Sequence, residues 1–258
     1  MTEALKKKLI SLADRYEVPE FTEGDPSQFL RWYEPKKGRG TVADVEVASF
    51  IAAMLAFGNR KQFIPKIRSI LETSDRSLGS ITEWLKAGTF AKDFPTGETK
   101  FYRFYSYDDM QIFFGELAEI LKKHDTLGEY VHKNYSETTA DLATIVSSAF
   151  PHSSIVPKGR TSANKRIHMF LRWMVRRGSS VDLGLWTWAD PADLLIPLDT
   201  HVMQEAAKLG LISPKSTASR KTAELLTAAL SQAFPGDPCR GDFALFGLGI
   251  DDSHLQNS

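Results

Sequence analysis

Cysteine is almost missing from this sequence: Cys239 is the only one among 258 residues. A single thiol cannot form an internal disulfide framework, and the chain alone cannot supply a four-thiolate zinc or iron–sulfur site. We therefore expect no iron–sulfur cluster, no other cofactor and no metal ligand. A reducing compartment fits this composition.

Long hydrophobic runs and a net charge are also lacking. No stretch approaches the roughly 18 apolar residues that span a membrane. Residues 1–15 mix lysines with Asp14 and Arg15 and lack the apolar core of a signal peptide. The formal net charge is zero, so global charge favours neither nucleic acid nor a membrane surface. The sequence predicts a cytoplasmic protein without a membrane partner.

What is present is helical periodicity along most of the chain. Residues 41–57 are apolar on nearly every side, which is typical of a helix at the centre of a bundle. The aromatic run 101–105 fits a strand or a helix, and its surroundings favour a helix. No convincing set of alternating strands is found elsewhere, so the predicted class is all-α.

Acidic residues are missing altogether between Pro151 and Val181. A helix that begins near Ser162 would place four basic side chains on one side, opposite its apolar residues. Such a stripe is typical of a surface that binds phosphates, although its arginines could instead pair with carboxylates elsewhere in the fold. The four side chains are Lys165, His168, Arg172 and Arg176.

In the stretch from Pro197 to Val202, Asp199 stands at the start of a helical pattern. Asp199 is placed to cap that helix, where first-turn N–H groups and the helix dipole favour an ionised carboxylate. The alternative is chemical: a fixed carboxylate behind an apolar strip can act as a base or stabilise a developing cation. Spacing alone leaves both open.

Two blocks together resemble the helix-hairpin-helix superfamily of DNA base-excision glycosylases. Residues 157–165 take the place of the hairpin and put Lys165 in the first turn of the next helix. Residues 198–202, Leu-Asp-Thr-His-Val, match the superfamily's aspartate block. The blocks 170–176, 196–202 and 242–249 are similar to an uncharacterised bacterial family that we associate with this superfamily.

The resemblance implies a two-lobed all-α fold, with a degenerate helix-hairpin-helix and a cleft between the lobes that holds Lys165 and Asp199. Residues 41–177 would form the central lobe, and residues 1–40 plus 178–258 the second. It also implies a monomer that acts on damaged duplex DNA, excises a base such as an oxidised purine, and cleaves the strand by β-elimination if Lys165 is the nucleophile.

The implied residues fall into three groups. The catalytic pair is Asp199 and Lys165. The expected substrate-binding residues are Asn59, His168, Arg172, Trp173, Trp186, His201 and Phe246. The expected contacts to the DNA backbone are Lys158, Gly159, Arg160, Arg166 and Arg176.

The sequence departs from the superfamily at the hairpin, where Gly159 stands alone in place of a G-x-G arrangement. The connection from Gly178 to Leu195 is also longer than in well-known members, and no cysteine loop for a cluster is present. The weakened hairpin favours the alternative function, a non-catalytic DNA- or RNA-binding protein that keeps the glycosylase fold.

Overall fold

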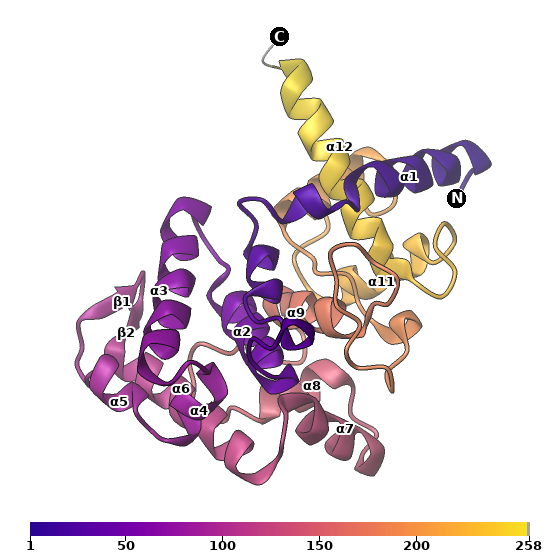
Figure 1. The fold of residues 1–258 in the computed structure, drawn as a ribbon. Coiled ribbons are helices and arrows are strands. Elements are labelled where there is room, and N and C mark those ends of the chain that lie inside the picture. Colours follow the sequence, from indigo (N-terminus) through magenta and orange to yellow (C-terminus); the bar gives the residue numbers. More distant parts are fainter. Residues whose placement is uncertain (257–258) are drawn as a thin grey trace. The chain divides into compact units, whose positions relative to one another are not determined.

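The computed structural model describes the backbone of residues 1–256 and the side chains of residues 1–249. In this part of the chain the fold is helical apart from one two-stranded hairpin, as the predicted all-α class requires (Figure 1). No helix in the described part is long and apolar enough to cross a membrane. The α-helices are α1 (Glu3–Tyr16), α2 (Val42–Leu55), α3 (Arg60–Leu78), α4 (Ile81–Lys86), α5 (Phe90–Asp93), α6 (Tyr107–Lys123), α7 (Leu127–Glu137), α8 (Leu142–Ser148), α9 (Lys165–Val175), α10 (Thr200–Lys208), α11 (Arg220–Leu230) and α12 (Gly241–Gln256).

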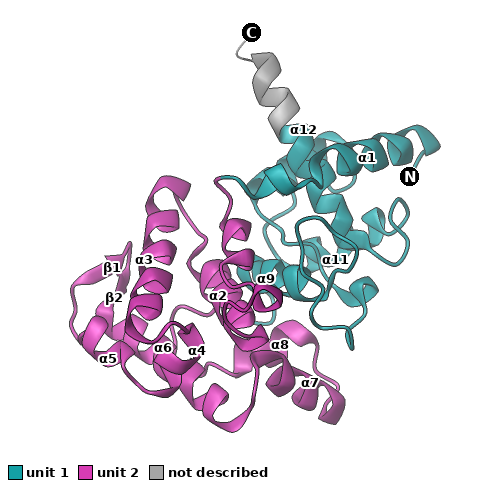
Figure 2. Ribbon diagram, viewed as in Figure 1, with its two compact units in different colours: residues 1–23, 158–258 teal, residues 24–157 magenta. Residues whose placement is uncertain are grey.

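The chain forms two compact units, of which one contains both termini (Figure 2). Unit 1 comprises residues 1–23 and 158–258, and unit 2 comprises residues 24–157. The sequence analysis placed the boundaries at 40/41 and 177/178, whereas the structure places them at 23/24 and 157/158. Helix α9 lies in unit 1, where Arg172 of the helix pairs with Asp242 and its C-cap residue Arg176 pairs with Glu17 and Asp237.

Unit 2 is built around α2, whose residues are all buried after Val42. The helix begins in a capping box: Thr41 Oγ1 accepts a hydrogen bond from the Asp44 N–H, and the Asp44 carboxylate accepts one from the Thr41 N–H. The ring of Phe50 stacks on that of Phe150 at a centroid distance of 4.9 Å. The predicted central helix at residues 41–57 is confirmed, ending at Leu55.

The helix expected at residues 101–105 is wrong, because these residues form an antiparallel hairpin of β1 (Lys100–Tyr102) and β2 (Tyr105–Ser106). Arg103 turns the chain with φ of 51°, in the left-handed region that a helix excludes. Ser106 then caps α6 through a capping box with Asp109.

Unit 1 packs α1, α10, α11 and α12 around one apolar cluster, which also includes Ile196 and Leu198 before α10. Helices α1 and α12 approach closely at Gly247, where a Cβ atom would lie 2.0 Å from Cδ2 of Tyr16. Members of the cluster include Leu9, Leu12, Ile196, Leu198, Val202, Ala206, Leu226, Leu230, Ala244 and Leu245.

Candidate active site

Lys165 and Asp199 meet in unit 1, with 2.7 Å between the lysine Nζ and the aspartate Oδ2. Lys165 is the first residue of α9, and Asp199 is the N-cap of α10. The second carboxylate oxygen, Oδ1, accepts a hydrogen bond from the Val202 N–H at 2.9 Å. Asp199 is therefore both a helix cap and the ion-pair partner of Lys165, and the cap expected from its sequence is confirmed.

The surroundings of Asp199 hold it ionised. Burial acts to raise its pKa, but the Lys165 ammonium, the hydrogen bond it donates, the Val202 N–H and His201 together lower the pKa below its ordinary value. Both side chains stay partly open to solvent, with 37% of Lys165 and 30% of Asp199 exposed. A small group can therefore reach the pair from solution.

The two arginines of the basic stripe, Arg172 and Arg176, are buried and form ion pairs with carboxylates. Arg176 is 1% exposed and its guanidinium donates to both oxygens of Asp237 at 2.7 Å, to Glu17 at 2.9 Å and to Asp182. Arg172 is 3% exposed and pairs with Asp182 at 3.3 Å and with Asp242. We call this set, Glu17, Arg172, Arg176, Asp182, Asp237 and Asp242, the buried ion network.

The ion network changes the role expected of Arg172 and Arg176. Both guanidinium groups donate to carboxylates, and both side chains are buried in this structure. The stripe of α9 is thus balanced by acids brought from residues 17, 182, 237 and 242. Pairing with carboxylates elsewhere is the alternative that the sequence left open.

Asp242 is a charged neighbour of Lys165 and Asp199 to which sequence reasoning gave no role. It lies in the first turn of α12, and burial raises its pKa to about 6 against the opposing effect of Arg172. The charges of Asp199 and Lys165 also act on this pKa, in opposite directions. Asp242 therefore lies within electrostatic reach of the catalytic pair. Its position at a helix start within the block 242–249 was the available signal.

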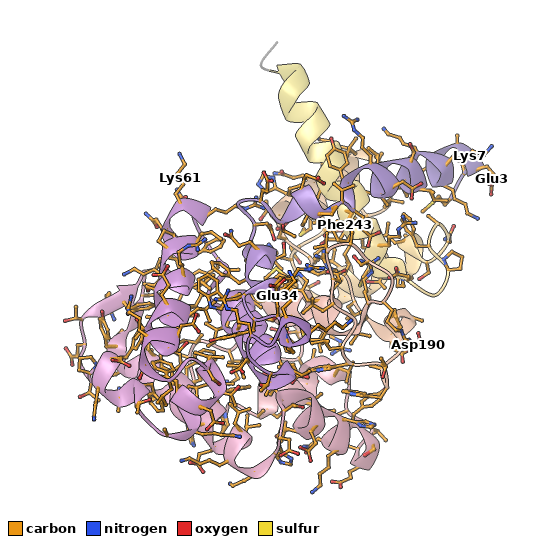
Figure 3. The ribbon with its side chains drawn as sticks, viewed as in Figure 1. Glu3, Lys7, Glu34, Lys61, Asp190 and Phe243 are labelled. Carbon is orange, nitrogen blue, oxygen red and sulfur yellow. The ribbon has the colours of Figure 1, made fainter. Side chains whose placement is uncertain are left out.

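The aromatic residues expected to stack on a base lie in the packed interior or against other rings. Trp173 is fully buried and Trp186 is 1% exposed, with the ring of Trp188 stacked on the latter at 5.4 Å. Phe246 is half-buried against Phe21. Its neighbour Phe243 lies on α12 (Figure 3). The Phe243 ring is buried and lies beneath the Arg172 guanidinium at 4.6 Å.

The remaining predicted residues divide between surface, interior and the other unit. Lys158, Gly159, Arg160 and His201 are exposed, Arg166 is half-buried and His168 is buried. In the segment before α9, Ser162 forms an isolated antiparallel β-bridge with Ser219. Asn59 caps the start of α3 in unit 2 by accepting a hydrogen bond from the Lys61 N–H at 2.9 Å.

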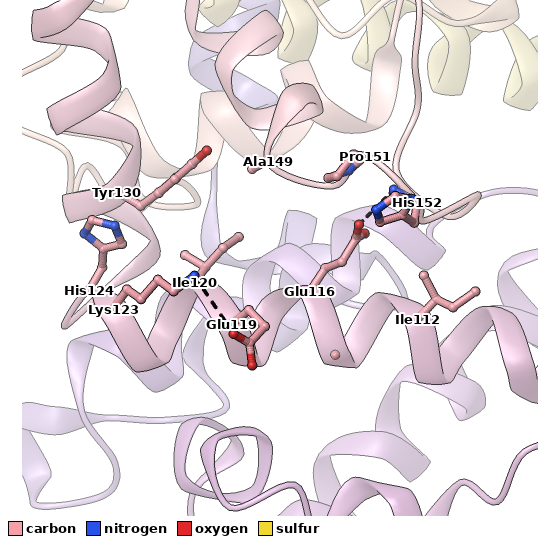
Figure 4. Close-up of a pocket in the computed structure, with 11 residues that line it drawn as sticks. Ile112, Glu116, Glu119, Ile120, Lys123, His124, Tyr130, Ala149, Pro151 and His152 are labelled. Atoms are coloured by element: carbon pink, nitrogen blue, oxygen red, sulfur yellow. Dashed lines mark hydrogen bonds and ion pairs between the residues drawn. The ribbon is translucent and has the colours of Figure 1, made fainter.

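A separate cavity of about 430 Å³ lies in unit 2 along α6, between α7 and the end of α8 (Figure 4). Its floor is apolar, from Ile112 to Ile120, and Glu116 accepts hydrogen bonds there from the backbone N–H groups of His152 and Ser153. None of the predicted site residues lines it. Among the residues that the structure describes, no cluster of three or more His, Cys, Asp or Glu side chains is arranged to hold a metal ion.

Comparison with known proteins places the chain in a family. A family described as "Protein of unknown function (DUF2400)" matches residues 25–251. The chain belongs to the DUF2400 family. Neither the curated proteins nor the solved structures compared with it give a significant match.

Proposed function

We propose that this DUF2400 protein is a DNA base-excision glycosylase with an associated lyase activity, acting on a damaged base such as an oxidised purine. The observation that carries the proposal is the contact between Lys165 and Asp199, 2.7 Å apart at the starts of two helices. A lysine nucleophile beside a fixed, ionised carboxylate is the arrangement this chemistry needs. The two-lobed glycosylase-like fold is part of the same proposal.

The proposed chemistry starts with a flipped nucleotide, which costs a few kcal/mol and least for a damaged or mispaired base. The Lys165 amine, once it has lost a proton, attacks sugar C1′ as the bond to the base breaks. Asp199 remains anionic and stabilises the positive charge that develops on the sugar. Opening of the sugar ring gives an iminium with Lys165, and loss of a C2′ proton expels the 3′ phosphate.

Binding to the DNA backbone falls, in this proposal, to the exposed part of the basic window. Lys158 and Arg160 are exposed, and Lys165 and Arg166 at the start of α9 are partly exposed, whereas Arg172 and Arg176 are buried. Neutralising phosphates with exposed cations makes the affinity fall as salt rises. A Lys158→Gln, Arg160→Gln variant should therefore bind duplex DNA more weakly, with a shallower salt dependence.

An Asp199→Asn variant tests the catalytic role. Asn caps a helix about as well as Asp, so the fold of α10 should survive while the charge is lost. We expect base release from a lesion duplex to fall by at least 100-fold, with the affinity for that duplex little changed. Retained base release would contradict the proposal.

The alternative is a nucleic-acid-binding protein without turnover, which the single glycine at Gly159 favours. It predicts equal affinity for damaged and undamaged duplexes and no base release by the wild type. The same panel of duplexes therefore separates the two functions.

A further inference from the structure

We propose that Asp242 is the proton acceptor for Lys165, so that two carboxylates divide the work: Asp242 receives the lysine proton and Asp199 stays anionic beside the reacting sugar. The inference rests on the proposed function and deepens it. It gives a role to a residue to which the resemblance assigned none.

The geometry comes from one face of α9. Lys165 and Arg172 are seven residues apart, which on a helix brings them nearly in line. Lys165 holds Asp199 at the start of α10, and Arg172 holds Asp242 at the start of α12. Helices α10 and α12 pack against each other. The two carboxylates thus follow one another along the same side of α9, each held by a cation of that helix.

Contacts with Asp182 and Phe243 hold the Arg172 side chain in place, and Arg172 in turn holds Asp242. Its Nε donates to Asp182, whose side chain is fully buried, and its guanidinium lies over the Phe243 ring at 4.6 Å. The Asp242 side chain is 16% exposed, so it is neither sealed in the core nor free in solvent. The charges of Lys165 and Asp199 both act on Asp242, so in this proposal the Lys165 side chain turns from Asp199 to Asp242 when it gives up its proton.

The electrostatics of the two carboxylates differ in the sense that the roles require. The pKa of Asp199 is lowered, while burial raises that of Asp242 to about 6. In the folded chain Asp242 thus holds a proton more readily than Asp199. Its charged neighbours are Lys165 and Arg172 on α9, Asp199 on α10 and Asp182 after α9; the buried thiol of Cys239 also lies within its field.

The proton balance closes without a further reactant. The Lys165 ammonium gives one proton to the Asp242 carboxylate, and the freed electron pair on Nζ forms a bond to C1′. The bond between C1′ and the base breaks, and its electron pair stays on the base nitrogen. Asp242 then returns the proton to the departing base, directly or through water, and is ionised again. Two carboxyl groups whose pKa values are held apart often divide acid and base roles in this way.

The test is the pH profile of single-turnover base release and of borohydride trapping on a lesion duplex. In the wild type, the rate should fall below about pH 6, because a protonated Asp242 cannot accept a second proton. Asp242→Asn should lower the maximal rate by 100-fold or more. It should also remove the fall in rate below about pH 6, which we call the acid limb of the profile. Asp242→Glu, which restores a carboxylate, should recover part of the rate and the limb.

Asp237→Asn is the matched control, since it also removes one carboxylate from the buried ion network but contacts Arg176. It should keep the acid limb, and thermal melts of all variants report whether each is folded. An Asp242→Asn profile equal to that of the wild type would overturn the role of Asp242 while leaving the proposed function standing. A wild type that releases no base from any duplex would overturn the proposed function and this step together.

Discussion

Replacing Arg176 by methionine should lower the free energy of unfolding by about 3–5 kcal/mol, the usual cost of removing one partner from a buried ion pair. Methionine keeps much of the apolar stem but no donor. The change leaves Asp182, which is fully buried, and Glu17, which is 7% exposed, without the guanidinium that bonds them. Asp237 keeps 28% of its side chain in solvent and contributes less to the loss.

Urea denaturation followed by circular dichroism measures this loss, with Arg177→Met as the matched control. Arg177 is exposed and donates only to the carbonyl groups of Thr187 and Ala189, so its replacement should cost less than about 1 kcal/mol. The deficit of Arg176→Met should shrink as the pH falls, because protonation neutralises the orphaned carboxylates. Equal costs for the two substitutions would refute the view that Arg176 serves the ion network and not a phosphate.

Two further predictions concern stability. Gly247→Ala should destabilise the protein by about 1–3 kcal/mol, because the added Cβ would lie 2.0 Å from the Tyr16 ring. Thermal melts measure this loss. A variant as stable as the wild type would contradict the close packing of α1 on α12. For Asp242, moving the pKa from 3.8 to about 6 corresponds to about 3 kcal/mol of stability that is present below pH 3.8 and lost as the pH rises through 6. The unfolding free energies of the wild type and Asp242→Asn should therefore differ by an amount that changes between pH 4 and pH 7, and a constant difference would contradict the raised pKa.

The parts of this account that sequence alone predicted depend on local patterns. The apolar run 41–57 predicts a buried helix because nothing but an interior can accept so many apolar side chains. Asp199 predicts a helix start because its carboxylate reaches N–H groups three residues away. Both signals need no knowledge of distant segments, and both appear in the structure.

The parts that sequence missed depend on contacts between distant segments. The sequence of α9 alone does not show whether its basic stripe will face water, phosphates or carboxylates. Its actual partners lie as far away as Glu17, 159 residues before Arg176 along the chain. Asp242 escaped notice for the same reason, since its pKa is set by burial and by Arg172, 70 residues before it.

The hairpin at residues 100–106 shows a different limit. Aromatic residues suit both a strand and a helix, and the choice is made by a turn at Arg103 with a positive φ. Arginine carries no strong preference for that conformation, so position 103 lacks a turn signal of the kind that glycine or asparagine provides. The tertiary packing of Tyr102 and Tyr105 into unit 2 decided the outcome.

The most direct test of the proposed function is borohydride trapping of the purified protein on duplexes that carry 8-oxoguanine, an abasic site or no lesion. Lys165→Gln is run beside the wild type, with Lys215→Gln, an exposed lysine of the same unit, as the control. The account predicts a covalent adduct on lesion DNA that persists in Lys215→Gln and disappears in Lys165→Gln. No adduct with the wild type, together with equal binding to all three duplexes, would contradict it.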